Sequence, residues 1–225
     1  MGYKGQRKHQ KKVAAPKQWY VGKLRGVYAT KAGAGPHKTR ECLPLTVLLQ
    51  QRLKYAINRD EARKIVKNRD GNIHVDGKVR RDPRFPVGSM DVVSINKTNE
   101  HFRILLDVKG RFQPHRIEAK EATFKLCRVN TKQIGKSKIP HITTHDGRTV
   151  RFAHPDIAVN DTVKINLSSG AIEQVIKLTN NCNVMLTGGN NIGRIGILTS
   201  IEKHPGSFDI AHIRDSRGNA FSTRI

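Results

Sequence analysis

Residues 43–57, LPLTVLLQQRLKYAI, and residues 60–68, DEARKIVKN, form the most regular stretch of the sequence. In the first segment, apolar residues recur at positions 45, 48, 49, 53, 56 and 57. This spacing has the 3.6-residue period of an amphipathic helix, and Pro44 suits its first turn. In the second segment, early acidic residues and Lys67 near the end match the polarity of a helix. The stretch therefore predicts two short helices.

The cations of this region lie off the two apolar stripes. They are Arg52, Arg59, Arg63, Lys64 and Lys67. Such a charged helix face is usually a solvated surface, and that interpretation stays open. Contact with RNA is favoured because the residues that follow carry more cations.

Residues 71–95, GNIHVDGKVRRDPRFPVGSMDVVSI, predict a small sheet after the helices. Ile73 and Val75 alternate with polar residues, and Asp76-Gly77 is typical of a tight hairpin turn. A strand at 78–80 follows, and a last strand is expected at 91–95. The helices and this sheet together predict a compact module over residues 42–95.

From residue 96 onwards the pattern is one of short alternating strands, which is typical of small β barrels. The expected strands are HFRILLDV, LCRVNTKQI, RTVRFA, DTVKINL and AIEQVIKL, with turns at 109–110, 146–147 and 169–170. Residues 118–124, EAKEATF, predict a single helical turn. We divide this region into a central β domain, 96–176, and a last β domain, 177–225.

The glycines of residues 186–196, LTGGNNIGRIG, suggest a phosphate-binding loop, but that interpretation fails. Such loops need a helix after the glycines, whereas GRIG is followed by the β-branched run ILTSI. Glycines here are better explained as positions where strands bend or where a backbone comes close to a partner.

The charge of the chain indicates a polyanionic partner. It has 42 basic and 18 acidic residues, a net charge of +24, and a pI near 10.5. Residues 1–40 contain eleven Lys and Arg and no acid, so residues 1–41 predict an extended arm that nucleic acid orders. Trp19, Tyr20 and Tyr28 lie among these cations. They either stack on unpaired bases or anchor the arm on the protein itself.

No pattern for catalysis, a cofactor, a metal or a membrane stands out. Ser-His-Asp order, paired carboxylates and a nucleotide loop are lacking. The cysteines are far apart and fit a reducing compartment. His141 and His145 lie four residues apart, but the segment is β-branched and has no Glu after the first, so we expect a strand histidine and a turn histidine. No stretch approaches the length of a membrane-spanning helix, and the charged N-terminus does not resemble a signal peptide.

Several stretches together resemble one family. They include RKHQKKVAAPKQW (7–19), GPHKTRECLPL (35–45), FPVGSMDVVSI (85–95), IPHITTHDGRT (139–149) and LTGGNNIGRIG (186–196). In this order they are similar to the S4-type protein of the small ribosomal subunit of archaea and eukaryotes, in its eukaryotic branch. The resemblance extends from about residue 7 to the end of the chain.

The resemblance implies an α+β fold that is mostly β. It has the basic arm, an alpha-L RNA-binding module over 42–95, a central β-barrel-like domain and a C-terminal SH3-like KOW barrel. Family members usually continue past the STR segment, whereas this chain stops at Ile225. The resemblance therefore leaves three alternatives: the last barrel lacks an edge strand, another protein covers that edge, or the gene product is truncated.

The implied function is that of a structural constituent of the small ribosomal subunit, which binds and stabilises rRNA. Its expected partners are rRNA and neighbouring small-subunit proteins, without a membrane, cofactor or small-molecule substrate. Its expected location is the cytoplasmic ribosome, with nucleolar transit if the source is eukaryotic. The predicted RNA-contacting residues are Lys4, Arg7, Lys8, Lys11, Lys12, Lys17, Trp19, Lys23, Arg25, His37, Lys38, Arg40, Arg52, Arg59, Arg63, Lys78, Arg80, Arg81, Gly193, Arg194 and Gly196.

Two other functions are alternatives for this sequence. An RNA-modifying enzyme is suggested because the alpha-L module often accompanies pseudouridine synthases, but such an enzyme needs a larger α/β catalytic domain. A KOW-containing factor that binds the ribosome transiently is the second. Salt distinguishes such a factor from a core subunit protein. A factor held by a few phosphate contacts dissociates from the ribosome as the salt concentration rises, whereas a protein threaded into folded RNA should stay bound.

Overall fold

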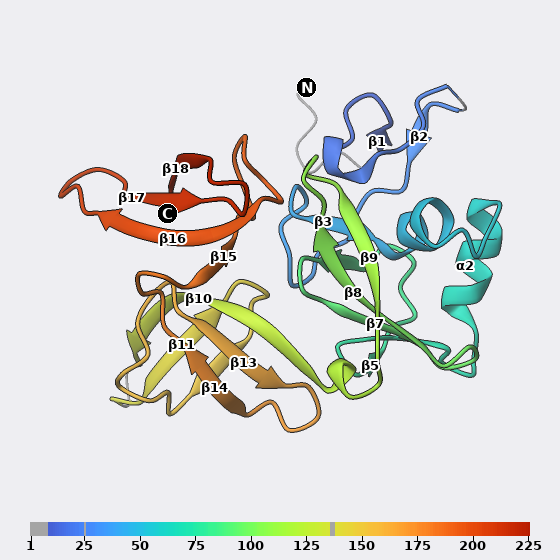
Figure 1. Cartoon of the computed structure of the whole chain (residues 1–225). Coiled ribbons are helices and arrows are strands. Elements are labelled where there is room, and N and C mark those ends of the chain that lie inside the picture. Colours follow the sequence, from blue (N-terminus) through green and yellow to red (C-terminus); the bar gives the residue numbers. More distant parts are fainter. Residues whose placement is uncertain (1–8, 25, 136–137) are drawn as a thin grey trace, which may run out of the picture.

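The computed structural model describes residues 9–24, 26–135 and 138–225, which form small antiparallel sheets and short helical segments. Figure 1 shows a green sheet in the middle, with the helices and the arm on one side of it. A yellow and orange sheet and a red sheet lie on the other side. The fold is mostly β, as the sequence predicts. Within the described residues, no helix is long and apolar enough to cross a membrane.

The first predicted helix is shorter than its apolar stripe. An α-helical turn, α1 (Leu45–Val47), continues into η2 (Leu48–Arg52), where Leu53 N donates to Leu48 O over 3.0 Å. The helix ends there because Lys54 has a φ of +58°, which breaks the helical path. Ile57, at the end of the predicted stripe, is 84% exposed. The prediction of a helix to residue 57 is therefore wrong.

The second predicted helix is present as α2 (Arg59–Lys67). Asn58 caps it, and Glu61 completes a capping box by accepting the Asn58 N–H at 3.3 Å. Ala62 and Val66 are buried on its inner face. The cap lies two residues before Asp60, where the sequence pattern placed the helix start.

The middle sheet has the strand order β5-β4-β7-β8-β9. Its strands are β4 (Ile73–Val75), β5 (Lys78–Val79), β7 (Val92–Ile95), β8 (Glu100–Leu106) and β9 (Phe112–Ile117). A two-stranded sheet of β3 (Cys42–Pro44) and β6 (Pro86–Gly88) packs beside it. Asp76 and Gly77 have positive φ values, which confirms the predicted hairpin.

We expected a domain boundary between residues 95 and 96, but the sheet of the helical module continues past this point. Strands β8 and β9 pair with β7, in the sheet of the helical module. Phe102, Ile104, Leu106 and Phe112 are buried in the same core as the helices. The first folded unit therefore extends to about Ile117, followed by the predicted helical turn, η3 (Glu121–Thr123).

The central sheet has the order β12-β11-β10-β13-β14. Its strands are β10 (Phe124–Ile134), β11 (Pro140–Thr144), β12 (Thr149–Arg151), β13 (Thr162–Asn166) and β14 (Ile172–Ile176). It encloses a separate small core that includes Val129, Ile142 and Val163. His141 lies in β11 and His145 in the turn after it, as predicted.

The last sheet is an antiparallel meander of β15 (Asn183–Met185), β16 (Ile195–Glu202), β17 (Ile210–Arg214) and β18 (Ala220–Arg224). GRIG leads directly into β16, which confirms that no helix follows these glycines. The SH3-like barrel remains a prediction.

The arm is irregular but folded onto the first unit over its described residues. Strand β1 (Gln10–Lys11) pairs with β2 (Tyr28–Ala29), and a short turn, η1 (Lys17–Trp19), lies between them. Trp19 and Ala32 belong to the core of the helical module. We expected this part of the arm to need RNA to order it, but burial of Trp19 holds it on the protein.

Candidate nucleic-acid interface

Helix α2 presents several exposed cations along its length, beside its buried residues Ala62 and Val66. Arg59 and Arg63 are four residues apart and exposed, so they lie on one side of the helix. Lys64 and Lys67 are exposed as well. Among the residues that the structure describes, no carboxylate forms an ion pair with any of these four side chains. Asp60 and Glu61 are exposed on the same helix, so its surface has a net positive charge in which the cations form no ion pairs with described residues.

The β4–β5 hairpin adjoins this surface. Arg81 Nη2 donates to Arg69 O at 3.0 Å, which ties the hairpin to the loop that follows α2. Lys78 and Arg81 are exposed. Arg80 is half-buried, and its guanidinium carbon lies 4.5 Å from the centroid of the Phe85 ring. Cations on a helix and an adjoining hairpin can follow a phosphate backbone.

The described arm cations lie mostly on the surface. Lys11, Lys17, Lys23, Lys38 and Arg40 are exposed, and Lys12 is half-buried. Lys17 and Arg40 both line an open cavity of about 420 Å³ between η1 and residues 39–40. Lys4, Arg7, Lys8 and Arg25 were also predicted to contact RNA, and they lie outside the described residues.

Two of the predicted RNA contacts are buried. Trp19 is fully buried, and its Nε1 donates to Cys42 O at 2.5 Å. His37 is buried, and its Nε2 lies 2.9 Å from Asp91 Oδ2. Burial leaves little of either ring accessible to a base, which argues against RNA contact at both residues. Of the two alternatives for Trp19, the structure supports anchoring of the arm.

Gly193 and Gly196 are also buried, and packing explains them. A Cβ at Gly193 would collide with Asp107 O in the β8–β9 turn, and its φ of +82° favours glycine. A Cβ at Gly196 would lie 2.6 Å from Arg214 O. At both glycines the backbone therefore comes close to another segment of this chain, and not to an external partner. Arg194 between them is exposed, with its guanidinium 5.2 Å from the Phe221 ring.

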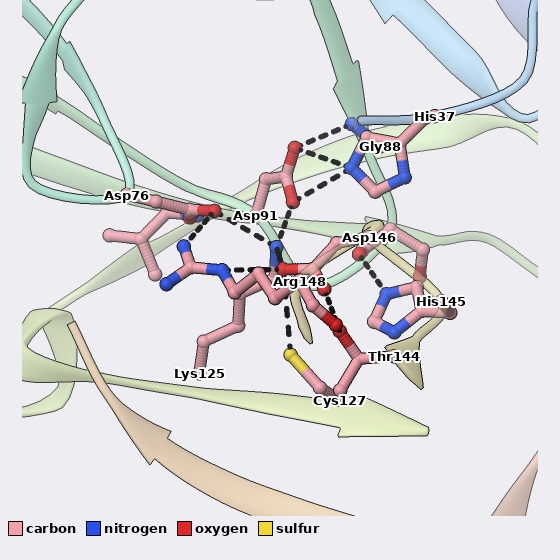
Figure 2. A network of polar contacts seen from close by, with 12 residues as sticks. His37, Asp76, Gly88, Asp91, Lys125, Cys127, Thr144, His145, Asp146 and Arg148 are labelled. Atoms are coloured by element: carbon pink, nitrogen blue, oxygen red, sulfur yellow. Dashed lines mark hydrogen bonds and ion pairs between the residues drawn. The ribbon is translucent and has the colours of Figure 1, made fainter. Parts of the chain in front are cut away.

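A buried ionic network, built around Lys125, joins the units that carry these cations. Lys125 is fully buried in β10, and its Nζ lies 2.9 Å from both Asp76 Oδ2 and Asp146 Oδ2. It also forms an ion pair with Asp91. Figure 2 shows the three carboxylates converging on this lysine. Asp76 and Asp91 come from the helical module, and Asp146 comes from the central sheet.

Further contacts complete the Lys125 network. Arg148 donates to Asp146 at 2.8 Å and to Asp76 at 2.9 Å. Asp91 accepts the Gly88 N–H at 2.8 Å and the contact from His37 of the arm. The arm, the helical module and the central sheet therefore meet at one set of buried charges (Figure 2).

The protonation of the Lys125 network follows from its partners. Burial alone would lower the pKa of Lys125, but its three carboxylates outweigh burial and raise the pKa. Burial would raise the pKa of Asp91, yet Lys125, followed by His37 and the Gly88 N–H, brings it down to about 2. The pKa of Asp146 is likewise lowered, against burial, chiefly by Lys125. These groups therefore stay charged at neutral pH.

One cluster near Lys125 has metal-ligating side chains. Ligand atoms of Cys127, His145 and Asp146 lie within 4.8 Å of one another. However, Lys125 already bonds to Asp146 Oδ2, and burial raises the pKa of the Cys127 thiol, which keeps it protonated. A metal would have to displace Lys125 from Asp146, so these residues as arranged do not favour a metal.

Sequence reasoning missed the Lys125 network. The one available signal is that Lys125 alternates with Cys127 and Val129, which are inward positions of β10. A lysine in such a position needs a buried partner. The three aspartates lie 21, 34 and 49 residues away from Lys125, so no local pattern identifies them.

The fold and its surface are those of a basic binding protein built from small modules. A buried ionic network joins these modules, and a helix and a hairpin carry cations that form no ion pairs with the described residues. Three family models match the chain. The RS4NT (NUC023) domain covers residues 4–40, the S4 domain covers 43–93, and the ribosomal family S4e covers 98–172.

Two relatives agree with these matches. The small ribosomal subunit protein eS4 of Ixodes scapularis is 54% identical over 222 residues, covering 99% of this chain and 84% of that protein. The crystal structure of the 30S ribosomal protein S4e from Thermoplasma acidophilum matches with a TM-score of 0.69 and 28% identity, over 82% of this chain and 91% of that one. The chain belongs to the S4e family of ribosomal proteins. It is a structural constituent of the ribosome and not an enzyme.

Proposed function

We propose that this chain is part of the small ribosomal subunit and binds rRNA through its exposed cations. The observation that carries the proposal is the surface of α2 and the β4–β5 hairpin. Arg59, Arg63, Lys78 and Arg81 are exposed there without a carboxylate partner among the described residues. The match to the S4 domain covers this same region.

The proposed mechanism is electrostatic and architectural. Double-stranded RNA offers phosphates, 2′-hydroxyl groups and shape more than readable base edges. Arginine suits the phosphates because its planar group can make two parallel hydrogen bonds. Most contacts therefore position the protein on RNA instead of reading sequence.

The Lys125 network gives this surface a fixed geometry. Because it joins the arm, the helical module and the central sheet, their cations keep a constant spacing before RNA is bound. A pre-organised surface loses less conformational freedom on binding than separate modules would. The proposed partners are thus rRNA and adjacent small-subunit proteins, on cytoplasmic ribosomes, with assembly in the nucleolus in a eukaryotic cell.

The affinity of the full chain for purified small-subunit rRNA, measured across a range of salt concentrations, tests this function. A variant with Gln at Arg59, Arg63, Lys78 and Arg81 should bind more weakly. Its log-affinity against log-salt slope should be shallower by about 0.7–0.9 for each lost contact. A charge-matched control carries Gln at Lys109, Lys120, Lys203 and Arg217, which are exposed residues outside the proposed surface. Equal slopes for the two variants would refute the proposed surface.

A further inference from the structure

Two arginines converge on one exposed tyrosine where the arm meets the first unit. The guanidinium carbon of Arg111 lies 3.9 Å from the centroid of the Tyr20 ring. That of Arg52 lies 5.5 Å from the same centroid. Tyr20 follows η1 in the arm, Arg52 ends η2, and Arg111 precedes β9. Residues distant in sequence thus form one small cluster.

The positive charge of this cluster is compensated only in part. Among the described residues, no carboxylate lies within 4.0 Å of either guanidinium group. The pKa of Arg52 is lowered by burial and then by the charge of Arg111, which Tyr20 and Asp107 offset only in part. Repulsion between two like charges in a half-buried place raises the free energy of the protein when no ligand is bound. A bound anion would relieve this repulsion.

The cluster also has unused hydrogen-bonding capacity. Arg52 Nη2 donates to Gln18 O at 3.1 Å and to Trp19 O at 3.3 Å. Its Nε is buried and has no hydrogen-bond partner. An orphaned buried donor of this kind costs free energy unless a ligand or water satisfies it.

The geometry of the cluster is set in advance. Tyr20 is 59% exposed and has a left-handed backbone, with φ of +49°. Its neighbour Trp19 is fixed by burial and by the hydrogen bond to Cys42. The Tyr20 backbone is therefore held beside the first unit, and its ring attracts both guanidinium groups. We call Tyr20, Arg52 and Arg111 the arginine clamp.

We propose that the arginine clamp binds one backbone phosphate of rRNA, held between Arg52 and Arg111. The inference rests on the proposed function, because it assigns a particular contact within it. A phosphodiester supplies the missing negative charge and accepts from the planar guanidinium donors. Since Tyr20 belongs to the arm, binding of this phosphate also strengthens the attachment of the arm to the first unit.

The experiment compares the full chain with its Arg111→Gln variant in binding to purified small-subunit rRNA. The salt slope of the variant should be shallower by about 0.7–0.9, the loss of one phosphate contact. Arg116→Gln is the matched control, because it removes the same charge from the same strand region. Arg116 is exposed and already pairs with Glu100 at 3.3 Å, so its slope should equal that of the wild type.

Thermal unfolding separates this role from a structural one. Arg111→Gln loses the contact with the Tyr20 ring but also removes the repulsion of Arg52, so the melting temperature should change little. Fluorescence of Trp19, the single tryptophan, should also stay unchanged, since the arm remains docked. A lower melting temperature together with altered Trp19 fluorescence would show that Arg111 is structural and would overturn the proposal.

The other possible results distinguish a failure of the arginine clamp from a failure of the proposed function. If the wild type does not bind rRNA, the proposed function itself is wrong. If the wild type binds and Arg111→Gln keeps the wild-type slope, only the arginine clamp is wrong. Inorganic phosphate is the other source of the same chemistry. If it raises the melting temperature of the wild type but not of Arg111→Gln, while the RNA slopes agree, the site takes the free ion and not RNA.

Discussion

Lys125 Nζ lies 2.9 Å from Asp76 Oδ2, so a buried lysine of the central sheet pairs with the hairpin turn of the helical module. The two residues are 49 positions apart. Their contact fixes the hairpin, with its exposed Lys78 and Arg81, relative to the central sheet. The proposed RNA surface thus depends on a charge cluster that is largely buried within the protein.

Replacing Lys125 with Met should destabilise the protein strongly. The change leaves three carboxylates without their central cation, and breaking a buried ion pair in this way costs about 3–5 kcal/mol. The free energy of unfolding, from denaturant titration, measures the effect. Lys164→Met is the control, because Lys164 pairs with Glu173 near the surface of the adjoining strand and should cost about 1 kcal/mol or less. Similar losses in both variants would contradict the central role of Lys125.

Acid should weaken the Lys125 network. The folded pKa values of Asp91, about 2, and of Asp146 lie below those of the unfolded chain. Their contribution to stability is therefore complete above about pH 5 and is lost as the pH falls toward 2. Unfolding free energies measured across this range should decline steeply for the wild type.

The Asp91→Asn variant tests the source of this acid sensitivity. It should be less stable at neutral pH but should lose less stability on acidification, because one of the shifted carboxylates is gone. Asp156→Asn provides the control, since Asp156 is exposed, and its profile should follow the wild type. An unchanged pH profile in Asp91→Asn would argue against a shifted Asp91.

Trp19→Ala should release the arm from the first unit. Loss of a fully buried aromatic side chain costs about 3–5 kcal/mol, and here it removes the hydrogen bond to Cys42 as well. Trypsin should then cleave faster after Lys17 and Lys23, as followed by mass spectrometry. Tyr28→Ala, at an exposed aromatic of the same arm, should be digested like the wild type. Equal digestion of all three proteins would mean that Trp19 does not anchor the arm.

Gly193→Ala should destabilise the contact between the last sheet and the β8–β9 turn. A methyl group there collides with the Asp107 carbonyl, and overpacking of this kind costs about 1–3 kcal/mol beyond the backbone strain. Gly189→Ala is a close control, because its φ of +78° is similar but nothing lies within 4 Å of the added group. The difference between their melting temperatures isolates the collision, and no difference would refute it.

Local chemistry explains which parts of the fold could be predicted. The Asp76-Gly77 hairpin and the strand after Gly196 follow from turn residues and β-branched patterns close in sequence. The early end of η2 could not be seen, because Lys54 adopts a positive φ that its own residue type does not favour. Likewise, nothing local indicates that β8 joins the sheet of the helical module and not the central one.

The candidate RNA surface could likewise be predicted from the sequence only in part. Composition predicted a basic surface, and Arg59, Arg63, Lys78 and Arg81 are exposed on neighbouring elements. Composition cannot distinguish a buried aromatic from an exposed one, so Trp19 had two interpretations until its burial was known. Partnerships such as that of Arg111 with Tyr20 depend on how distant segments pack, which a single sequence does not contain.

The most direct test of the account is sedimentation of native cell lysate through sucrose gradients at low and at high salt, followed by detection of this chain. We expect the chain to sediment in stoichiometric amount with the small ribosomal subunit at both salt concentrations, because cations locked into one rigid surface hold many phosphates at once. Release to the top of the gradient at high salt would contradict an integral rRNA-binding role and would indicate a factor that binds the ribosome transiently.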